Sequence, residues 1–245
     1  MLDRRHDPSS VYVMACRYYN GDGVRRNPQR AYKLAILAAS LGHVPAISAL
    51  GSHYDYGIGV RPNQHLAFAY YLAAANAGDS GALVNVGACY ADGIGVQKNW
   101  KRAFQYFERA ARRGVPEALH YVGKCYRFGQ GKPRDIRRGF RFELKAAQKG
   151  VAEAQYSVAY CYSRGSGVKV NPMEAFRWYA RAAKNGLAEA QYNLAYLYEK
   201  GKGTKASMRS AFEWYTRAAE HGDVDAKQAV DRLRGSRSKR QPSNS

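Results

Sequence analysis

The sequence predicts an all-α protein: a right-handed α/α superhelix (solenoid) of six 36-residue helix-turn-helix repeats, closed by a C-terminal capping helix. Two observations lead to this fold class. Triplets of the form Gly-x-Gly recur every 36 residues, beginning at Gly21, Gly57, Gly93, Gly129, Gly165 and Gly201. Tyrosines recur with the same period, at Tyr18, Tyr54, Tyr90, Tyr126, Tyr162 and Tyr198. Two independent series in one register indicate a repeat protein, whose units bury their apolar faces by stacking.

The first helix of each repeat is indicated by apolar residues at helical spacing. In the last repeat, Ala190, Leu194, Ala195 and Tyr198 form one stripe with the 3.6-residue period of an α-helix. The Gly-x-Gly triplet then ends the helix, because glycine readily adopts the positive φ that a helix C-terminus commonly requires.

The second helix of each repeat begins after a capping residue. Asparagine or aspartate precedes this helix in five repeats, and Ser207 takes the same place in the sixth. Each second helix contains an Ala-Ala pair, most contain several aromatic residues, and a glycine such as Gly186 ends the helix. Helices of about a dozen residues are marginal alone, so we expect consecutive helices to pack against one another.

These patterns divide the chain into three parts. Residues 1–9 are an N-terminal extension, and residues 10–234 are the solenoid. The repeats span residues 10–45, 46–81, 82–117, 118–153, 154–189 and 190–225, and the capping helix spans 226–234. Residues 235–245 are rich in serine and basic residues and are interpreted as a disordered basic tail.

The pattern within each repeat resembles a known family. Residues 188–198 read Ala-Glu-Ala-Gln-Tyr-x-x-Ala-Tyr-x-Tyr, and residues 211–219 read Ala-Phe-x-Trp-Tyr-x-x-Ala-Ala. With the intervening Gly-x-Gly triplet, these segments resemble the Sel-one-like repeat (SLR), a 36-residue relative of the tetratricopeptide unit. The resemblance implies a tetratricopeptide-like α-solenoid that acts as an adaptor between proteins. The pentatricopeptide repeat, whose members bind RNA, is the runner-up, although it lacks the doubled glycine.

The fourth repeat departs most from this pattern. Gly139 stands where other repeats have alanine. Glu143 stands where four other repeats have an aromatic residue: Tyr71, Phe107, Tyr179 and Tyr215. Residues 114–149 contain nine lysines and arginines against three aspartates and glutamates, so this repeat is also the most basic.

Composition excludes several classes of protein. Hydrophobic residues make up 46% of the chain, which is too many for a disordered protein. The apolar runs are too short for a membrane span or a signal peptide, so we expect neither. Cys89, Cys125 and Cys161 are equivalent residues of successive repeats. Stacked helix pairs should place them about 10 Å apart, which is too far for disulfides. Reduced cysteines favour an intracellular, cytoplasmic protein, and the basic tail leaves a nuclear location open.

No residue pattern indicates catalysis. The six histidines show neither metal-ligand spacing nor a nucleophile nearby in the sequence. The Gly-x-Gly segments lack the spacing of a phosphate-binding loop. We therefore expect a non-enzyme that has no metal and no cofactor.

Basic residues recur at equivalent positions of the second helices, in a chain whose net charge is +20. The main row is Arg109, Lys145, Arg181 and Arg217, and shorter rows contain Arg138 (with Arg102) and Arg141 with Arg177. Stacking of repeats aligns such positions, and we place these rows on the convex side. They are either a solvated outer face or a track for phosphates and acidic segments.

The exposed positions of the first helices are expected to face the concave groove, the usual ligand surface of solenoids. In the N-terminal half these positions hold small, plain residues such as Ser48 and Ser52. In the C-terminal half they hold four tyrosines beside a basic strip: Tyr156, Tyr160, Tyr192 and Tyr196, with His120, Lys124 and Arg127. Tyrosine and arginine are typical of binding hot spots, although Tyr156 and Tyr192 also match the family's packing pattern.

The sequence thus supports two functions. The first is a non-enzymatic interaction scaffold or adaptor that binds a peptide or protein surface in the concave groove and prefers acidic or aromatic segments. The alternative is binding of nucleic acid or another anionic surface through the basic rows and the basic tail. In either case we expect a monomer.

Overall fold

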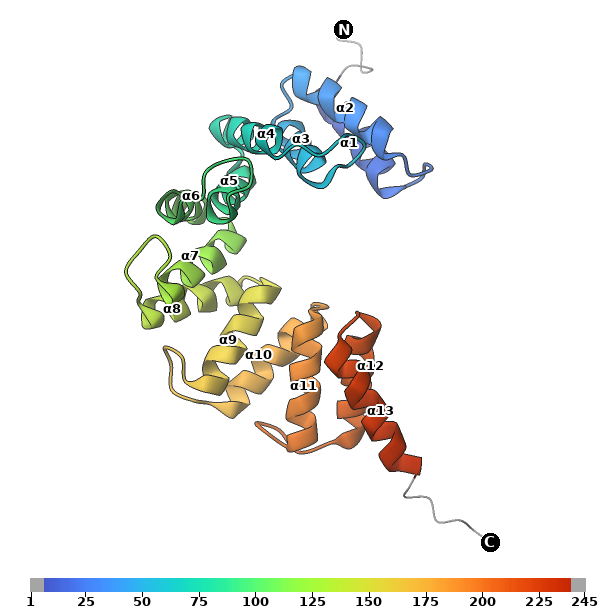
Figure 1. Cartoon of the computed structure of the whole chain (residues 1–245), viewed down its shortest axis with the longest axis vertical. Coiled ribbons are helices and arrows are strands. Elements are labelled where there is room, and N and C mark those ends of the chain that lie inside the picture. The colour runs from blue at the N-terminus through green and yellow to red at the C-terminus, as the bar shows by residue number, and fades with distance from the viewer. Residues whose placement is uncertain (1–6, 239–245) are drawn as a thin grey trace. The chain divides into compact units, whose positions relative to one another are not determined.

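The computed structural model describes residues 7–238, and every regular element in this range is an α-helix (Figure 1). The first helices of the repeats are α1 (Pro8–Asn20), α3 (Val44–Tyr56), α5 (Ser80–Asp92), α7 (Pro116–Phe128), α9 (Ala152–Arg164) and α11 (Ala188–Lys200). The second helices are α2 (Pro28–Ser40), α4 (Gln64–Asn76), α6 (Trp100–Arg112), α8 (Ile136–Gln148), α10 (Pro172–Lys184) and α12 (Met208–Glu220). A last helix, α13 (Val224–Ser238), follows them.

Equivalent helices begin at intervals of 36 residues, which confirms the predicted all-α solenoid of six helix-turn-helix repeats. The predicted capping residues are confirmed as well. Each accepts a hydrogen bond from the backbone N–H three residues later, and the set is Asn27, Asn63, Asn99, Asp135, Asn171 and Ser207. The first glycine of the triplet ends the preceding helix in the left-handed conformation, with φ of 68° at Gly57 and 82° at Gly93.

The second glycine of the triplet allows one repeat to pack directly on the previous one. Gly59 and Gly95 have φ values of 72° and 65°. A Cβ atom at Gly59 would collide with the carbonyl oxygen of Pro28, and one at Gly95 would collide with that of Gln64. Each loop therefore lies on the first turn of the preceding second helix, a closeness that only glycine permits.

The described residues form two compact units. Unit 1 contains residues 7–118 and 130–132, and unit 2 contains residues 119–129 and 133–238. In unit 1 the helices α1 to α6 pack against one another in chain order, and in unit 2 the helices α8 to α13 do the same. The residues of α7 from 119 onwards belong to unit 2.

The core of each unit combines alanines with large aromatic side chains. The first alanine of every Ala-Ala pair is 0% exposed: Ala38, Ala74, Ala110, Ala146, Ala182 and Ala218. Phe104 and Phe107 in unit 1 and Tyr215 in unit 2 are among the largest fully buried side chains. Small residues let neighbouring helices approach closely, and the aromatic rings fill the space that remains.

The cysteines are free thiols, as their spacing predicted. Cys89, Cys125 and Cys161 are buried, whereas Cys16 is partly exposed. Burial raises the pKa of the Cys89 thiol to about 12 and that of the Cys161 thiol to about 11. These two thiols are therefore protonated and unreactive at neutral pH.

The helix bounds differ at both ends from the segments drawn from the sequence. Helix α1 begins at Pro8, within the predicted extension of residues 1–9. Helix α13 begins two residues before the predicted capping helix of 226–234 and continues to Ser238, into the predicted tail of 235–245. The rest of that tail, residues 239–245, lies outside the described residues.

Candidate binding site

Three neighbouring pockets line the face of unit 2 that is formed by α7, α9, α11 and α13. Their volumes are about 440, 320 and 460 Å³. Tyr156 borders the first and second pockets, and Tyr196 borders the second and third, so the pockets form one row. All seven groove residues predicted from the sequence line this row: His120, Lys124, Arg127, Tyr156, Tyr160, Tyr192 and Tyr196. We call this surface the tyrosine face.

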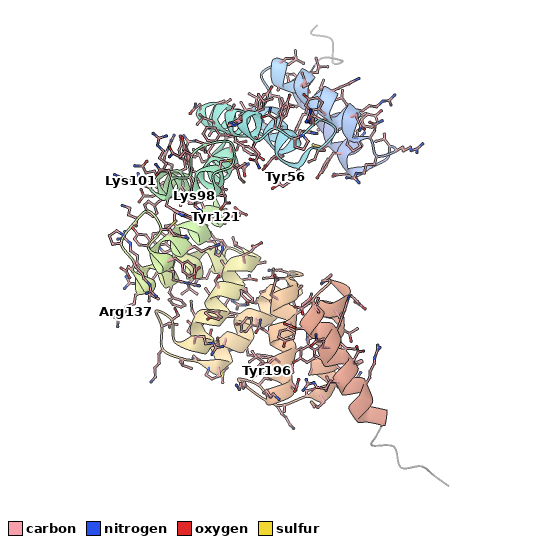
Figure 2. The ribbon with its side chains drawn as sticks, in the orientation of Figure 1. Tyr56, Lys98, Lys101, Tyr121, Arg137 and Tyr196 are labelled. Atoms are coloured by element: carbon pink, nitrogen blue, oxygen red, sulfur yellow. The ribbon has the colours of Figure 1, made fainter. Side chains whose placement is uncertain are left out.

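The four tyrosines of this face form two pairs with different environments. Tyr160 and Tyr196, in equivalent positions of α9 and α11, are 41% and 36% exposed (Tyr196 is labelled in Figure 2). Tyr156 and Tyr192 are partly buried, and their rings pack against Tyr179 and Tyr215 at centroid distances of 5.5 and 5.4 Å. Tyr156 and Tyr192 therefore hold the repeats together as well as lining the pockets.

The exposed tyrosines each have a basic neighbour. The guanidinium of Arg164 lies 6.0 Å from the ring centroid of Tyr160. The ammonium of Lys202 lies 5.3 Å from the ring centroid of Tyr196, and its Nζ atom is 3.5 Å from the tyrosine hydroxyl. A cation beside an aromatic ring gives the second pocket both contact area and positive charge.

The predicted basic strip of His120, Lys124 and Arg127 does not present three free positive charges. Arg127 donates a hydrogen bond to Oε2 of Glu143 at 2.7 Å, and its side chain is only 13% exposed. His120 is 8% exposed, and burial together with Lys124 and Arg127 lowers its pKa to about 4. At neutral pH His120 is therefore uncharged and the charge of Arg127 is balanced, so Lys124 supplies the free positive charge of this strip.

Glu143 is the main residue of this region that the search for site residues missed. Its side chain is 0% exposed, and burial raises the pKa of its carboxyl even though Arg127 acts in the opposite direction. Oε1 of Glu143 and Nδ1 of His120 are 3.9 Å apart, and neither atom has a hydrogen-bond partner among the described residues. The signal was present in the sequence, because Glu143 replaces an aromatic residue of the repeat.

The basic rows consist of exposed side chains, and several of these lie over aromatic rings. Within unit 2, Arg181 lies 4.4 Å from the Trp178 centroid and Arg217 lies 4.5 Å from the Trp214 centroid. The remaining pairs are Lys145 with Phe142, Arg138 with Tyr126 and, in unit 1, Arg109 with Tyr106. Arg177 forms an ion pair with Glu174 at 2.7 Å, and Arg141 is exposed.

Unit 1 has a pocket of its own that the sequence reasoning missed. Its volume is about 460 Å³, and its lining includes Tyr12, Cys16, Tyr19 and His53. Tyr56, which also lines it, is 74% exposed (Figure 2). The exposed positions predicted for the N-terminal half of the groove held small, plain residues such as Ser48 and Ser52, which also line this pocket. Tyr19 and Tyr56 lie outside the periodic tyrosine series, and that was the available signal.

The described residues contain neither a metal-binding cluster nor a membrane-spanning helix. Within residues 7–238, no three histidine, cysteine, aspartate or glutamate side chains are grouped so that they could hold a metal ion. None of the helices in this range has the length and apolar character needed to cross a bilayer.

Comparison with known structures gives close matches over most of the chain. A Sel1 repeat protein from Oxalobacter formigenes has 31% sequence identity and a TM-score of 0.81, over 89% of this chain and 87% of that chain. The protective antigen c5321 of uropathogenic Escherichia coli, which displays an SLR fold, has 28% identity and a TM-score of 0.68. That match covers 92% of this chain but only 49% of c5321.

A more distant likeness concerns the fold alone. Yeast Tom70 has 13% identity and a TM-score of 0.57, over 96% of this chain and 49% of that chain. A comparison with curated protein sequences gave no match. The Sel1 repeat itself matches six times, at residues 8–43, 44–79, 80–115, 116–151, 152–187 and 188–223. The chain therefore belongs to the Sel1 repeat family.

Proposed function

We propose that this protein is a non-enzymatic interaction scaffold that holds a peptide or protein segment on the tyrosine face of unit 2. The observation that carries this proposal is the row of three pockets, which the half-exposed rings of Tyr160 and Tyr196 border. Sel1 repeat solenoids generally serve as non-catalytic scaffolds, which supports the same function.

The chemistry of the face favours an extended segment with acidic and aromatic residues. Tyrosine contributes a large contact area at a small cost in side-chain entropy. Lys124 and Lys202 place positive charge at the first and second pockets. Glu153 and Glu189 border the first pocket as well, so an acidic residue of the partner gains most near the second pocket.

A selection of peptides from a random library tests this proposal. Peptides selected on the intact chain should be enriched in acidic and aromatic residues. They should bind at least about tenfold more weakly to a Tyr160→Ala/Tyr196→Ala variant, because truncating a hot-spot aromatic residue typically costs 2 kcal/mol or more. Binding constants from fluorescence anisotropy give the comparison.

A matched control is available in the same two repeats. Met173 is the second residue of α10 and Met208 is the first residue of α12, and each is 55% exposed. A Met173→Ala/Met208→Ala variant should bind the selected peptides as the unmodified protein does. Equal losses in both variants, or no loss in the tyrosine variant, would contradict the assignment of the tyrosine face.

The second candidate function is binding of nucleic acid or another anionic surface through the basic rows. It is favoured by the exposure of all seven predicted row residues. Neutralising Lys145, Arg181 and Arg217 should then weaken the binding and reduce its dependence on salt. Both candidates are proposed for a monomer that acts in the cytoplasm. A nuclear location is the alternative, and the basic tail would then be the segment that directs the protein there.

A further inference from the structure

One edge of unit 1 is formed by its Gly-x-Gly loops together with the first turns of its second helices. We define this loop edge as residues 21–30, 57–66, 93–102 and 130–132. Its parts are contiguous, because the loop of each repeat lies on the helix start of the previous one. Gly59 packs on Pro28, Gly95 packs on Gln64, and Gly131 packs on Trp100, in each case against the carbonyl oxygen.

The loop edge carries the entire net charge of unit 1. Residues 7–118 and 130–132 contain thirteen lysines and arginines and seven aspartates and glutamates. Eight of these cations but only one of the acids, Asp22, belong to the loop edge. Elsewhere in these residues, five lysines and arginines are balanced by six aspartates and glutamates. The positive charge is therefore confined to one edge of the unit.

The eight cations of the edge are exposed, and little on the edge neutralises them. They are Arg25, Arg26, Arg30, Arg61, Lys98, Lys101, Arg102 and Lys132. Asp22 accepts a hydrogen bond from Asn20 at 2.9 Å. The helices α2, α4 and α6 have neutral asparagine caps and no acidic residue in their first turns. The partial positive charges of three helix N-termini thus add to those of the side chains.

Aromatic rings hold half of these cations in place. Arg30 lies over the ring of Tyr18 at 5.5 Å, and Lys98 lies over the ring of Trp100 at 5.6 Å. The other two pairs are Arg102 over Tyr90 at 5.5 Å and Lys132 over Phe104 at 4.8 Å. Ordering by a ring lowers the entropy that a cation loses when an anion binds. Tyr18 and Trp100 are themselves partly exposed.

The N-terminal end of the loop edge contains a cavity. A cavity of about 590 Å³ is lined by Arg25, Arg26 and Arg30 together with Tyr18 and the start of α2. The side chain of Arg26 donates to the carbonyl oxygen of Tyr19 at 3.1 Å, and that of Arg30 donates to the Tyr18 hydroxyl at 3.2 Å. No acidic residue lines this cavity, so it suits a phosphate group.

We propose that the loop edge of unit 1 binds the phosphodiester backbone of a single-stranded nucleic acid. Interleaved basic and aromatic residues are what such a strand requires, since its phosphates seek cations and its unpaired bases stack on rings and guanidinium planes. An acidic lipid surface is a poorer fit. Surface-bound proteins insert several apolar side chains, whereas Leu66 is the one large hydrophobic residue of the loop edge that is exposed.

This inference goes beyond the proposed scaffold function, because it concerns unit 1 and leaves the tyrosine face free. It also differs from the main basic row of the second candidate function, because Arg109, Lys145, Arg181 and Arg217 lie towards the opposite ends of the second helices, although Arg102 of the loop edge aligns with Arg138 of a shorter row. On α6, Lys101 and Arg102 belong to the loop edge, whereas Arg109 and Arg112 lie in the last turn. The two locations are therefore separable within a single helix.

Fluorescence anisotropy with labelled U20 RNA and dT20 DNA tests the inference on the full chain. The edge variant is Lys98→Gln/Lys101→Gln/Lys132→Gln, and the control variant is Arg109→Gln/Arg112→Gln/Arg113→Gln. Both remove three charges from unit 1. At 50 mM salt the edge variant should bind about tenfold more weakly, and its slope of log K against log salt should fall by about 2. The control should stay within about threefold of the unmodified chain.

Each alternative result overturns the inference. Equal losses in the two variants would mean that binding follows net charge, and a larger loss in the control would place the strand on the basic rows. Tighter binding to a poly-glutamate peptide or to phosphatidylserine vesicles than to either oligonucleotide would assign the edge to another partner. Equal affinity for a duplex and for the single strands would show that unpaired bases do not contribute to binding. The Tyr160→Ala/Tyr196→Ala variant should bind both oligonucleotides normally, whatever the fate of the scaffold proposal.

Discussion

The guanidinium of Arg127 and the carboxylate of Glu143 are joined by a 2.7 Å hydrogen bond at a site where other repeats pair different side chains. The two residues are sixteen positions apart. At the same spacing, the Tyr215 hydroxyl donates to Glu199 at 3.0 Å. In the second repeat Tyr71 follows Asp55 at this spacing, and its hydroxyl donates to Ser52 at 3.2 Å. In the third repeat the corresponding residues, Phe107 and Ala91, both lack a polar group. The fourth and sixth repeats therefore join the two positions by a hydrogen bond, each with a different pair of side chains.

Breaking the buried pair should destabilise the protein strongly. An Arg127→Met variant leaves the carboxylate of Glu143 buried without its cation, and loss of one partner of a buried pair costs about 3–5 kcal/mol. Urea denaturation measures the free energy of unfolding. Arg177→Met is the matched control, because Arg177 also contacts a carboxylate at 2.7 Å but is 60% exposed, so its loss should cost less than about 1 kcal/mol. Similar losses for the two variants would refute the argument.

Replacing both members of the pair should restore stability. An Arg127→Ser/Glu143→Tyr variant recreates the Ser163 and Tyr179 pair of the fifth repeat. Gly123 provides space for the ring, since Gly51 lies equally close to Tyr71 in the second repeat. We expect its free energy of unfolding to lie within about 1 kcal/mol of that of the unmodified protein. A double variant as unstable as Arg127→Met would mean that position 143 does not accept the family's aromatic residue.

His120 should make stability depend on pH. Burial and the nearby charges of Lys124 and Arg127 lower its pKa in the folded protein to about 4, from an ordinary value of 6.5. The unfolded chain therefore binds the proton first, so stability is complete above pH 6.5 and is lost as pH falls towards 4. The loss due to His120 is at most about 3 kcal/mol. The raised pKa of Glu143 acts in the opposite direction, weakening the folded state as pH rises above 4.5.

A His120→Gln variant separates these two effects. Both proteins retain Glu143, Lys124 and Arg127, so the difference between their pH profiles belongs to the imidazole. Urea denaturation between pH 4 and 7 should show a smaller loss of stability for the variant on acidification. Parallel profiles would show that His120 takes up its proton equally well in the folded and unfolded states.

The second glycine of the triplet should tolerate substitution less well than the glycine that ends the second helix. Gly95 and Gly78 both have positive φ, but only at Gly95 would a Cβ atom collide with backbone. Gly78→Ala should cost about 1 kcal/mol for its left-handed backbone, and Gly95→Ala about 3 kcal/mol or more. Thermal unfolding of the two variants gives the comparison, and equal melting temperatures would argue against close loop packing.

The capping helix should depend on one ion pair with α11. Arg232 donates to both carboxylate oxygens of Glu199, at 3.1 and 2.7 Å. This interaction lowers the pKa of Glu199 to about 2, so the contribution is present above pH 4.5 and is lost as pH falls towards 2. Because Arg232 is 56% exposed, Arg232→Ala should cost only about 1 kcal/mol.

Hydrogen exchange gives a local readout of this change. The amides of α13 should exchange about fivefold faster in the Arg232→Ala variant, which corresponds to the loss of about 1 kcal/mol. The amides of α1 and α2, in unit 1, serve as the internal control and should not change. Unaltered protection of α13 would mean that its apolar contacts, such as those of Leu233, hold it alone.

Much of the fold was predictable because its determinants are local and recur. Asn63 caps α4, and Gly57 ends α3, through interactions within a few residues of each. Hydrogen bonds between residues of different repeats were harder to predict from the sequence. Gln155 accepts a hydrogen bond from Asn185 at 2.9 Å, and His221 hydrogen bonds to Gln191 at the same distance. These partners are thirty residues apart, and their contact depends on how one repeat stacks on the next.

The sequence by itself predicted the period, the helices with their caps, the family, and seven of the residues that line the tyrosine face. Only the tertiary structure decided which of those residues carry a free charge. The sequence alone does not distinguish the charge of Arg127 from that of Lys124, yet Arg127 is neutralised by the carboxylate of Glu143, sixteen residues away. Burial leaves His120 uncharged. Helix formation depends on neighbours along the chain, whereas charge state depends on neighbours in space, which packing brings together.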